Sequence, residues 1–140
     1  MIKSEADPIT DDEVVLRLIW HEFFTAGPPA RVSDSAFTPK PNEQGGVSLY
    51  RASCLADAVE TLRAVALEKR SMYAIAALSV AALRGLGFTL VPDKNLVVAG
   101  HVMLKELTSE SYKSDKAKWR PVLTRLAELA RDSIVWRPDQ

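Results

Sequence analysis

The chain has 140 residues, and its 18 basic and 18 acidic side chains leave a formal net charge of zero. A hydrophobic fraction of 47% and a charged fraction of 26% are those of an ordinary globular domain. A chain of this length forms one domain and buries enough surface to fold without disulfides or metals. The balanced charge offers no general attraction for nucleic acid or an acidic membrane surface, so a nucleic-acid-binding function is disfavoured.

Cysteine usage and the apolar stretches indicate the compartment. Cys54 is the single cysteine, which excludes an intramolecular disulfide and an all-cysteine metal site. The polar, acidic residues 1–12 lack the apolar region of a secretory signal. The longest apolar stretch, 72–83, is shorter than the ~20 residues that span a bilayer. We therefore expect a cytoplasmic protein with no membrane-spanning segment.

The amino-terminal region contains a polar segment and an ambiguous one. Residues 1–9 are expected to form a flexible leader, and residues 10–140 a single globular domain. Thr10 and Glu13 fit a capping box, which favours a helix. The run 14–20 is rich in β-branched and aromatic residues, which favours a strand. The apolar residues are too dense for either period to dominate, and we lean slightly towards a strand.

A long loop follows. Residues 27–46 hold four of the eight prolines and three of the six glycines. Loops of this length in a compact domain are usually functional or disordered. The apolar–polar alternation over 47–51 then predicts a half-buried strand. We expect the loop and the adjacent strand edge to contact another protein.

Helices and short strands are interspersed over the rest of the chain. Residues 55–70 place apolar side chains on one face and predict a helix. The stretch 72–83 is nearly all apolar and rich in alanine, which predicts a buried central helix. The remaining elements are expected as short strands at 88–91, 96–99 and 101–107, and a last helix from Ser114 or Asp115 to Asp132. The expected fold class is α+β, with a small, mainly antiparallel sheet packed against two or three helices.

His101 is the strongest candidate for catalytic chemistry. It opens an apolar strand, and Asp93 across a short loop could orient its imidazole for general acid–base work. Ser48 is a candidate nucleophile. The alternative is that His101 packs at a strand edge with a satisfied ring. No spacing of histidine or cysteine supports a metal site.

Two arginines are candidates for binding. Arg17 and Arg51 each lie within an apolar run, where an arginine faces solvent or pairs with a carboxylate. Two such side chains facing one groove could bind phosphate or carboxylate. The glycines do not form a phosphate loop between a strand and a helix, so no cofactor is expected.

Four short motifs follow one another along the chain: Leu16–Ile19, Ala36-Phe37, Val47-Ser48 and His101-Val102. In this order they resemble the motifs of a family of small bacterial proteins with no known activity. The resemblance covers roughly residues 14–107. It implies that five residues form one cluster, namely Arg17, Ser35, Phe37, Ser48 and His101.

An arginine strand, a Gly-Gly loop, a Ser/Tyr strand and the helix sequence LADAVETL follow one another along the chain. This order resembles NAD-using ADP-ribosyltransferase folds. Those enzymes depend on a late catalytic glutamate or comparable polar residue. Glu106 falls on the corresponding predicted strand, 101–107, outside any diagnostic motif.

These patterns leave two functions open. The first is a protein–protein interaction module of the immunity, antitoxin or accessory-subunit type, for which a homodimer is also compatible with the apolar first segment. The alternative is a small nucleotide- or NAD-directed enzyme. In that enzyme His101 and Ser48 would be catalytic, and Arg17, Ser35, Phe37 and Arg51 would bind the substrate. The enzyme requires Arg17, Ser48, Arg51 and His101 to converge on one concave site.

Overall fold

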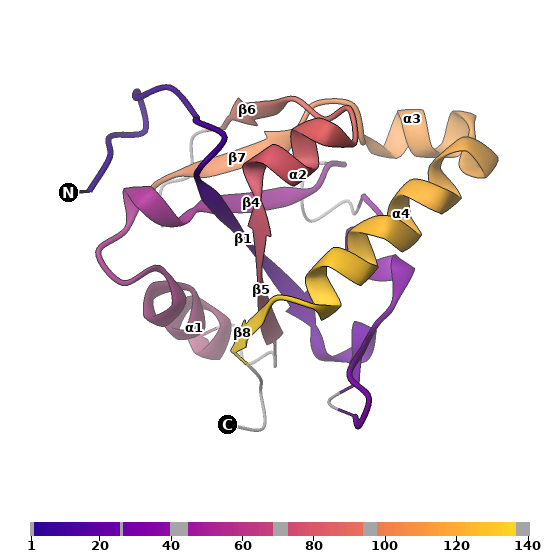
Figure 1. The fold of residues 1–140 in the computed structure, drawn as a ribbon, viewed down its shortest axis with the longest axis horizontal. Coiled ribbons are helices and arrows are strands. Elements are labelled where there is room, and N and C mark those ends of the chain that lie inside the picture. Colours follow the sequence, from indigo (N-terminus) through magenta and orange to yellow (C-terminus); the bar gives the residue numbers. More distant parts are fainter. Residues whose placement is uncertain (1, 26, 40–44, 69–72, 94–97, 137–140) are drawn as a thin grey trace.

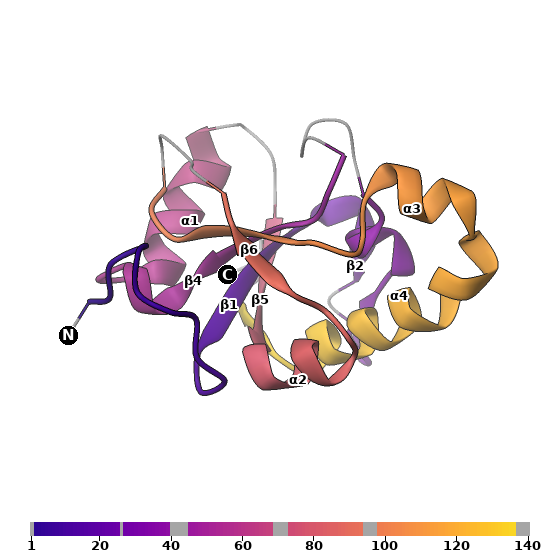
Figure 2. The ribbon, with the colours of Figure 1, turned by 90° about the horizontal axis from the view of Figure 1, so that it is seen from above.

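The computed structural model describes residues 2–25, 27–39, 45–68, 73–93 and 98–136. An antiparallel sheet forms its centre, with helices on both faces (Figure 1). Viewed from above, α1 (Ala58–Glu68) covers one face, and α2 (Val80–Gly85) and α4 (Lys116–Arg131) cover the other (Figure 2). The fold class is therefore α+β, as predicted.

The main sheet has six described strands in the order β6-β7-β4-β1-β5-β8, and every neighbouring pair is antiparallel. The strands are β1 (Val14–Trp20), β4 (Ser48–Arg51), β5 (Tyr73–Ser79), β6 (Leu90–Pro92), β7 (His101–Leu104) and β8 (Ile134–Trp136). The prediction of a strand at 14–20 is confirmed. Thr10 and Glu13, predicted to form a capping box, are still in contact. The Glu13 carboxylate accepts a hydrogen bond from the Thr10 backbone N–H at 2.8 Å.

Alternation along β1 divides the apolar side chains between two cores. Val15 and Ile19 join the larger core beneath α2 and α4. Leu16 and Leu18 join the smaller core beneath α1. Because directly paired residues of antiparallel strands point to the same face, the strand register carries this division across the sheet. We call these the α2/α4 face and the α1 face.

The alanine-rich stretch is a strand followed by a short helix, so the predicted buried central helix is wrong. β5 pairs with β1 from Val14↔Ser79 to Trp20↔Tyr73. Ser79 then caps α2, accepting a hydrogen bond from the Ala82 N–H at 3.2 Å. The helix preference of alanine is below about 1 kcal/mol per residue. Continuous pairing with the central strand outweighs that preference.

The other elements match the expectations approximately. α1 lies within the predicted 55–70, of which 69–70 are outside the described residues, and α4 forms most of the predicted last helix. Asp115 caps α4, and a separate short helix, α3 (Ser109–Ser114), precedes it. β6 begins two residues later than the predicted strand at 88–91. β7 begins where predicted but ends at Leu104. Residues 96–97 of the expected strand lie outside the described residues, and 98–99 are in no strand.

Much of the 27–46 loop is built into the fold. Its β3 (Arg31–Val32) pairs with β2 (Phe24–Thr25), and its 3₁₀ helix η2 (Asp34–Phe37) packs on α4. Residues 40–44 lie outside the described residues. The strand after the loop, β4, lies between β7 and β1 in the sheet, so it offers no free edge there.

Residues 2–9 lie against the domain, and we call them the amino-terminal strap. The Lys3 N–H donates to the Ser53 carbonyl at 2.8 Å, and the Gly100 N–H donates to the Glu5 carboxylate at 2.7 Å. Further contacts reach Arg51, as described below. The expected leader, apart from its first residue, is thus bound to the domain in this structure.

Candidate functional site

Arg17 joins the 27–46 loop to the sheet. Its side chain is 4% exposed on β1. Nε and Nη2 donate to the Ala36 carbonyl at 3.2 and 2.7 Å, and Nη1 donates to the Ser48 carbonyl at 2.9 Å. The guanidinium carbon lies 5.5 Å from the centroid of the Phe37 ring. The guanidinium of Arg17 thus forms these hydrogen bonds with backbone carbonyls of its own chain.

Arg51 forms a buried ion pair with Glu13 at the other end of the same sheet face. The two residues are 1% and 5% exposed. Nε donates to Oε1 at 2.8 Å and Nη2 donates to Oε2 at 3.0 Å. Nη1 also donates to the Asp7 carbonyl at 3.0 Å, and Nη2 to the Pro8 carbonyl at 3.3 Å. Arg51 therefore holds both the carboxylate and the amino-terminal strap.

The electrostatics of this pair favour its charged form. Burial raises the pKa of the Glu13 carboxyl, but hydrogen bonds from Arg51, Ser53 and the Thr10 N–H lower it by more. The pKa of Glu13 therefore lies well below its usual range. The hydrogen bond to Glu13 raises the pKa of Arg51 in turn. At neutral pH both groups are ionised.

Cys54 lies next to this pair, at the end of the 3₁₀ helix η4 (Ala52–Cys54). Its thiol is free and buried. Burial raises the pKa of Cys54, and the nearby Arg51 lowers it by less. A raised pKa leaves little thiolate at neutral pH, so the cysteine has no activation as a nucleophile.

His101 and Ser48 lie on the α1 face. His101 Nδ1 is 3.0 Å from the Asp93 carbonyl oxygen and 3.3 Å from its carboxylate, so the predicted Asp93–His101 contact is present. The centroid of the Tyr50 ring lies 5.2 Å from that of the imidazole. Ser48 Oγ is directed at Met103 Sδ, 3.5 Å away.

The structure does not bring the four residues of the enzyme alternative to one site. Arg51 pairs with Val15 in the sheet, and Arg17 lies two residues further along β1, so both arginines occupy the α2/α4 face. His101 pairs with Tyr50, which places it with Ser48 on the opposite face. The sheet itself lies between the arginines and the two candidate catalytic side chains.

The two remaining predicted binding residues lie in η2. Phe37 is fully buried beneath Arg17, and Ser35 is exposed at the surface. Of the five-residue cluster implied by the family resemblance, Arg17 and Phe37 are in side-chain contact, and Ser48 joins them through its carbonyl oxygen. His101 lies across the sheet.

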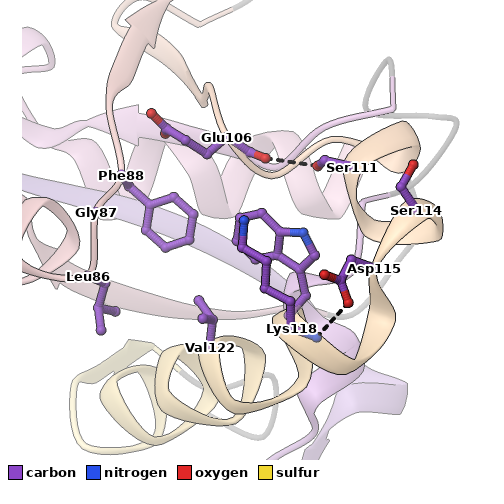
Figure 3. A pocket seen from close by; sticks show the side chains of 10 residues that line it. Leu86, Gly87, Phe88, Glu106, Ser111, Ser114, Asp115, Lys118 and Val122 are labelled. Carbon is purple, nitrogen blue, oxygen red and sulfur yellow. Dashed lines mark hydrogen bonds between the residues drawn. The ribbon is translucent and has the colours of Figure 1, made fainter.

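A cleft opens elsewhere, between the turn after α2 and the corner of α3 and α4 (Figure 3). Its volume is about 570 Å³. Phe88 and Trp119 form its floor, with ring planes inclined at 19° and centroids 6.1 Å apart. Leu86 and Val122 add apolar walls. These side chains can receive an apolar group.

The polar groups around the cleft are mostly engaged with the chain. Glu106 accepts hydrogen bonds from the Thr89 N–H at 2.7 Å and the Thr89 hydroxyl at 2.8 Å. Burial raises the pKa of Glu106, but these hydrogen bonds lower it by more. Ser111 donates to the Glu106 carbonyl at 2.8 Å. Lys118 Nζ, in contrast, lies over the Trp119 ring, 5.3 Å from its centroid.

Sequence reasoning missed this cleft because its residues come from three separate segments. Phe88 and Trp119 follow the pattern of ordinary core residues, and nothing in the spacing joins them. The available signal was local. Gly87, at φ +95°, ends the turn directly before Phe88, and Trp119 and Val122 share one helix face.

In the described part of the chain, no three His, Cys, Asp or Glu side chains are placed to hold one metal ion. None of the helices in this part combines the length and apolar character required to cross a membrane. Comparisons with protein-family models, curated proteins and solved structures found no match.

Proposed function

We propose that this chain is a protein-interaction module whose contact with its partner centres on the cleft at Trp119. One observation carries the proposal: a cleft of about 570 Å³ opens over the nearly buried rings of Phe88 and Trp119. Ligand-binding clefts usually measure about 300–1,000 Å³ and have apolar linings. Burial of a partner's apolar side chain there contributes about 25 cal/mol per Å² of apolar surface.

The hydrogen bonds and contacts that the polar residues already make favour a binding role over a catalytic one. To bind phosphate, Arg17 and Arg51 would have to give up hydrogen bonds to buried acceptors, at a cost of about 1–3 kcal/mol for each unpaired group. Nucleophilic catalysis requires a nucleophile within hydrogen-bond reach of its base. Here Ser48 is directed at Met103, and the His101 ring contacts Asp93 and Tyr50.

The edge strands favour contact at the cleft over contact in which a partner adds a strand to the edge of the sheet. β6 and β8, the two outer strands among the described residues, each have three residues. Thr89 and Asp93 bond β7 through the backbone, so the intervening Leu90 and Pro92 turn their backbone groups outward. Pro92 has no N–H to offer, which limits pairing at this edge.

The proposed setting is the cytoplasm of a bacterial cell. The single cysteine, buried and unpaired, fits a reducing compartment. A domain of 140 residues fits an immunity protein, an antitoxin or an accessory subunit. Each of these acts by binding one protein partner.

Affinity capture from the source cells, with a matched pair of variants, tests the proposal. Val122→Arg places a charge and a longer side chain in the cleft, and Val135→Arg places the same group on exposed β8. We expect a partner that the wild-type protein and Val135→Arg retain and that Val122→Arg loses. Urea unfolding of both variants confirms that they are folded.

Two results would contradict the proposal. A partner that Val122→Arg retains and Val135→Arg loses would place the contact at the β8 edge. Binding that survives both changes and is lost on His101→Ala would place it on the α1 face.

A further inference from the structure

The amino-terminal strap is held to the domain mainly by polar contacts. Of residues 2–9, all of them described, none is fully buried, whereas Arg51 beneath them is 1% exposed. The strap accepts hydrogen bonds from Arg51 and from the Gly100 N–H, and it donates one to the Ser53 carbonyl. Segments with few buried apolar contacts open locally at a lower free energy than the core. The strap is therefore the kind of segment that opens before the domain unfolds.

Ile9 is the point at which the strap joins the body of the domain. Its side chain is partly buried against the larger core, and its carbonyl oxygen accepts a hydrogen bond from Arg84 Nη2 at 2.7 Å. Residues 2–8, which the structure describes in full, belong to neither core. At the free end of the strap, Ile2 is 55% exposed. Movement of residues 2–8 about Ile9 would thus break polar contacts and leave both cores in place.

Cys54 lies beside the docked strap, which runs alongside the turn at 52–54 (Figure 1, Figure 2). The Lys3 N–H bonds the carbonyl of the neighbouring Ser53 at 2.8 Å. Glu5 bonds the Gly100 N–H at 2.7 Å, and a Cβ built on Gly100 would lie 2.8 Å from Cys54 Cβ. Burial raises the pKa of Cys54, and the Glu5 carboxylate raises it further. Two strap residues therefore flank a thiol that is 6% exposed.

We infer that residues 2–8 form a cover that opens as a unit about Ile9, without unfolding of the domain, and exposes the Arg51 guanidinium and the Cys54 thiol. The hydrogen bond between Glu5 and the Gly100 N–H is one of the contacts that hold the cover closed. The cover lies on the opposite side of the molecule from α3, and the inference does not depend on the proposed function.

The labelling rate of the thiol measures this opening, because Cys54 is the single cysteine. Dithiodipyridine, a neutral aromatic disulfide, is added to the native full chain. The Cys54 thiolate attacks one sulfur of the reagent, the disulfide bond of the reagent breaks, and a thiopyridone leaves as a mixed disulfide forms. The release of thiopyridone is followed from zero urea up to the unfolding transition.

Urea separates local opening from global unfolding, because its effect scales with the surface exposed. We expect a labelling rate that is nearly independent of urea at low concentration and rises steeply only near the transition. Ile19→Val removes one methylene from the larger core and lowers the free energy of unfolding. It should leave the labelling rate at low urea unchanged.

Glu5→Ala and Glu5→Gln form a matched pair. Both remove the charge near Cys54, but glutamine keeps an oxygen that can accept from the Gly100 N–H. We expect Glu5→Ala to label about fivefold faster than Glu5→Gln, the effect of one neutral hydrogen bond. If the cover opens as a unit, hydrogen exchange of the Lys3 N–H should accelerate by a similar factor. Exchange of the Arg51 N–H, which donates to the Gly100 carbonyl at 2.8 Å, should not change.

A labelling rate that rises from zero urea with the full slope of unfolding would overturn the inference, because the thiol would then be reached only when the domain unfolds. Equal labelling of Glu5→Ala and Glu5→Gln would also overturn it, as would wild-type Lys3 N–H exchange as slow as that of Arg51. The proposed function fails on a separate observation, the retention of the partner by Val122→Arg.

Discussion

At the scale of single residues, the Glu13–Arg51 pair shows how a charge can be buried in the core of a small domain. Arg51 donates to both oxygens of Glu13 and to carbonyls of the strap. Ser53 Oγ donates to the same carboxylate at 2.6 Å. Because these partners satisfy both ions, the pair connects the strap, β1 and β4 at one point.

Removal of one residue of the Glu13–Arg51 pair should therefore lower the stability of the fold. Arg51→Met leaves Glu13 charged and without its main partner, and we expect the free energy of unfolding to fall by about 3–5 kcal/mol. The double variant Glu13→Gln/Arg51→Met should recover part of this loss. Urea unfolding of the wild type, both single variants and the double variant measures the coupling. Losses that simply add would contradict the described pair.

The same pair predicts a pH dependence of stability. The pKa of Glu13 is lower in the folded state than in the unfolded state, so the folded state favours the ionised form. The stabilisation is complete above the unfolded-state pKa of about 4.3 and is lost as pH falls towards the lower folded-state pKa. Glu13→Gln should remove this part of the acid sensitivity.

The measurement compares urea unfolding of the wild type and Glu13→Gln at about pH 7 and about pH 3. The difference in stability between the two proteins should shrink at the lower pH. A difference that stays constant would mean that Glu13 titrates alike in both states.

At the scale of elements, Gly100, directly before β7, lies close against Arg51 at the end of β4 and Cys54 in η4. Its φ is +83°, and a Cβ built there would lie 2.8 Å from Cys54 Cβ and 3.2 Å from Arg51 Cβ. Both are backbone-anchored atoms, so neither can move aside easily. Gly85, at the end of α2, has nothing within 4 Å of such a Cβ.

Alanine substitutions at these glycines should therefore have opposite effects. Gly100→Ala should lower the free energy of unfolding by about 2 kcal/mol or more, because backbone strain and steric overlap add. Gly85→Ala should raise it by about 0.5–1 kcal/mol, because alanine restricts the unfolded chain. Urea unfolding of the two variants tests the difference. Equal effects would contradict the close approach of Gly100 to Arg51 and Cys54.

The elements also show what the sequence could predict. The strand at 14–20, the strand at the end of the long loop and the α4 helix follow from local composition and periodicity. The stretch 72–83 differs from its predicted helix because alanine favours a helix locally, whereas the pairing of β5 with β1 depends on residues about sixty positions away. Ser79 as the cap of α2 was the local signal that could have separated strand from helix.

The candidate site was harder to predict than the fold. The Asp93–His101 contact could be predicted because only a short loop separates the residues. The roles of Arg17 and Arg51 could not, because their acceptors are backbone carbonyls and a carboxylate brought near by folding. The face on which each residue lies depends on strand register, which the sequence pattern left open.

At the scale of the whole molecule, the net charge is zero, but acidic and basic side chains are concentrated in different regions. Residues 5–13 contain five acidic side chains and no basic one, and residues 110–120 contain four basic and two acidic ones. In Figure 1 the strap and α3 lie at opposite sides of the molecule. Composition alone excluded a general field, and the charged side chains that line the cleft, Glu106, Asp115 and Lys118, are of mixed sign.

Different regions of the molecule also have different roles. Arg17 joins the loop to the sheet, and Arg51 and Glu13 join the strap to it. The cleft at Trp119 has an aromatic floor, and its acidic groups are bound to the chain. We propose that recognition takes place at the α3–α4 corner and that the buried charges stabilise the fold.

One measurement tests this central claim most directly: the NMR footprint of the captured partner on the isotope-labelled chain. We predict that the largest shifts of backbone and indole N–H signals occur at Phe88, Lys118, Trp119 and Val122. Shifts confined to Ser48, Tyr50 and His101, with the cleft unaffected, would contradict the account and return the site to the α1 face.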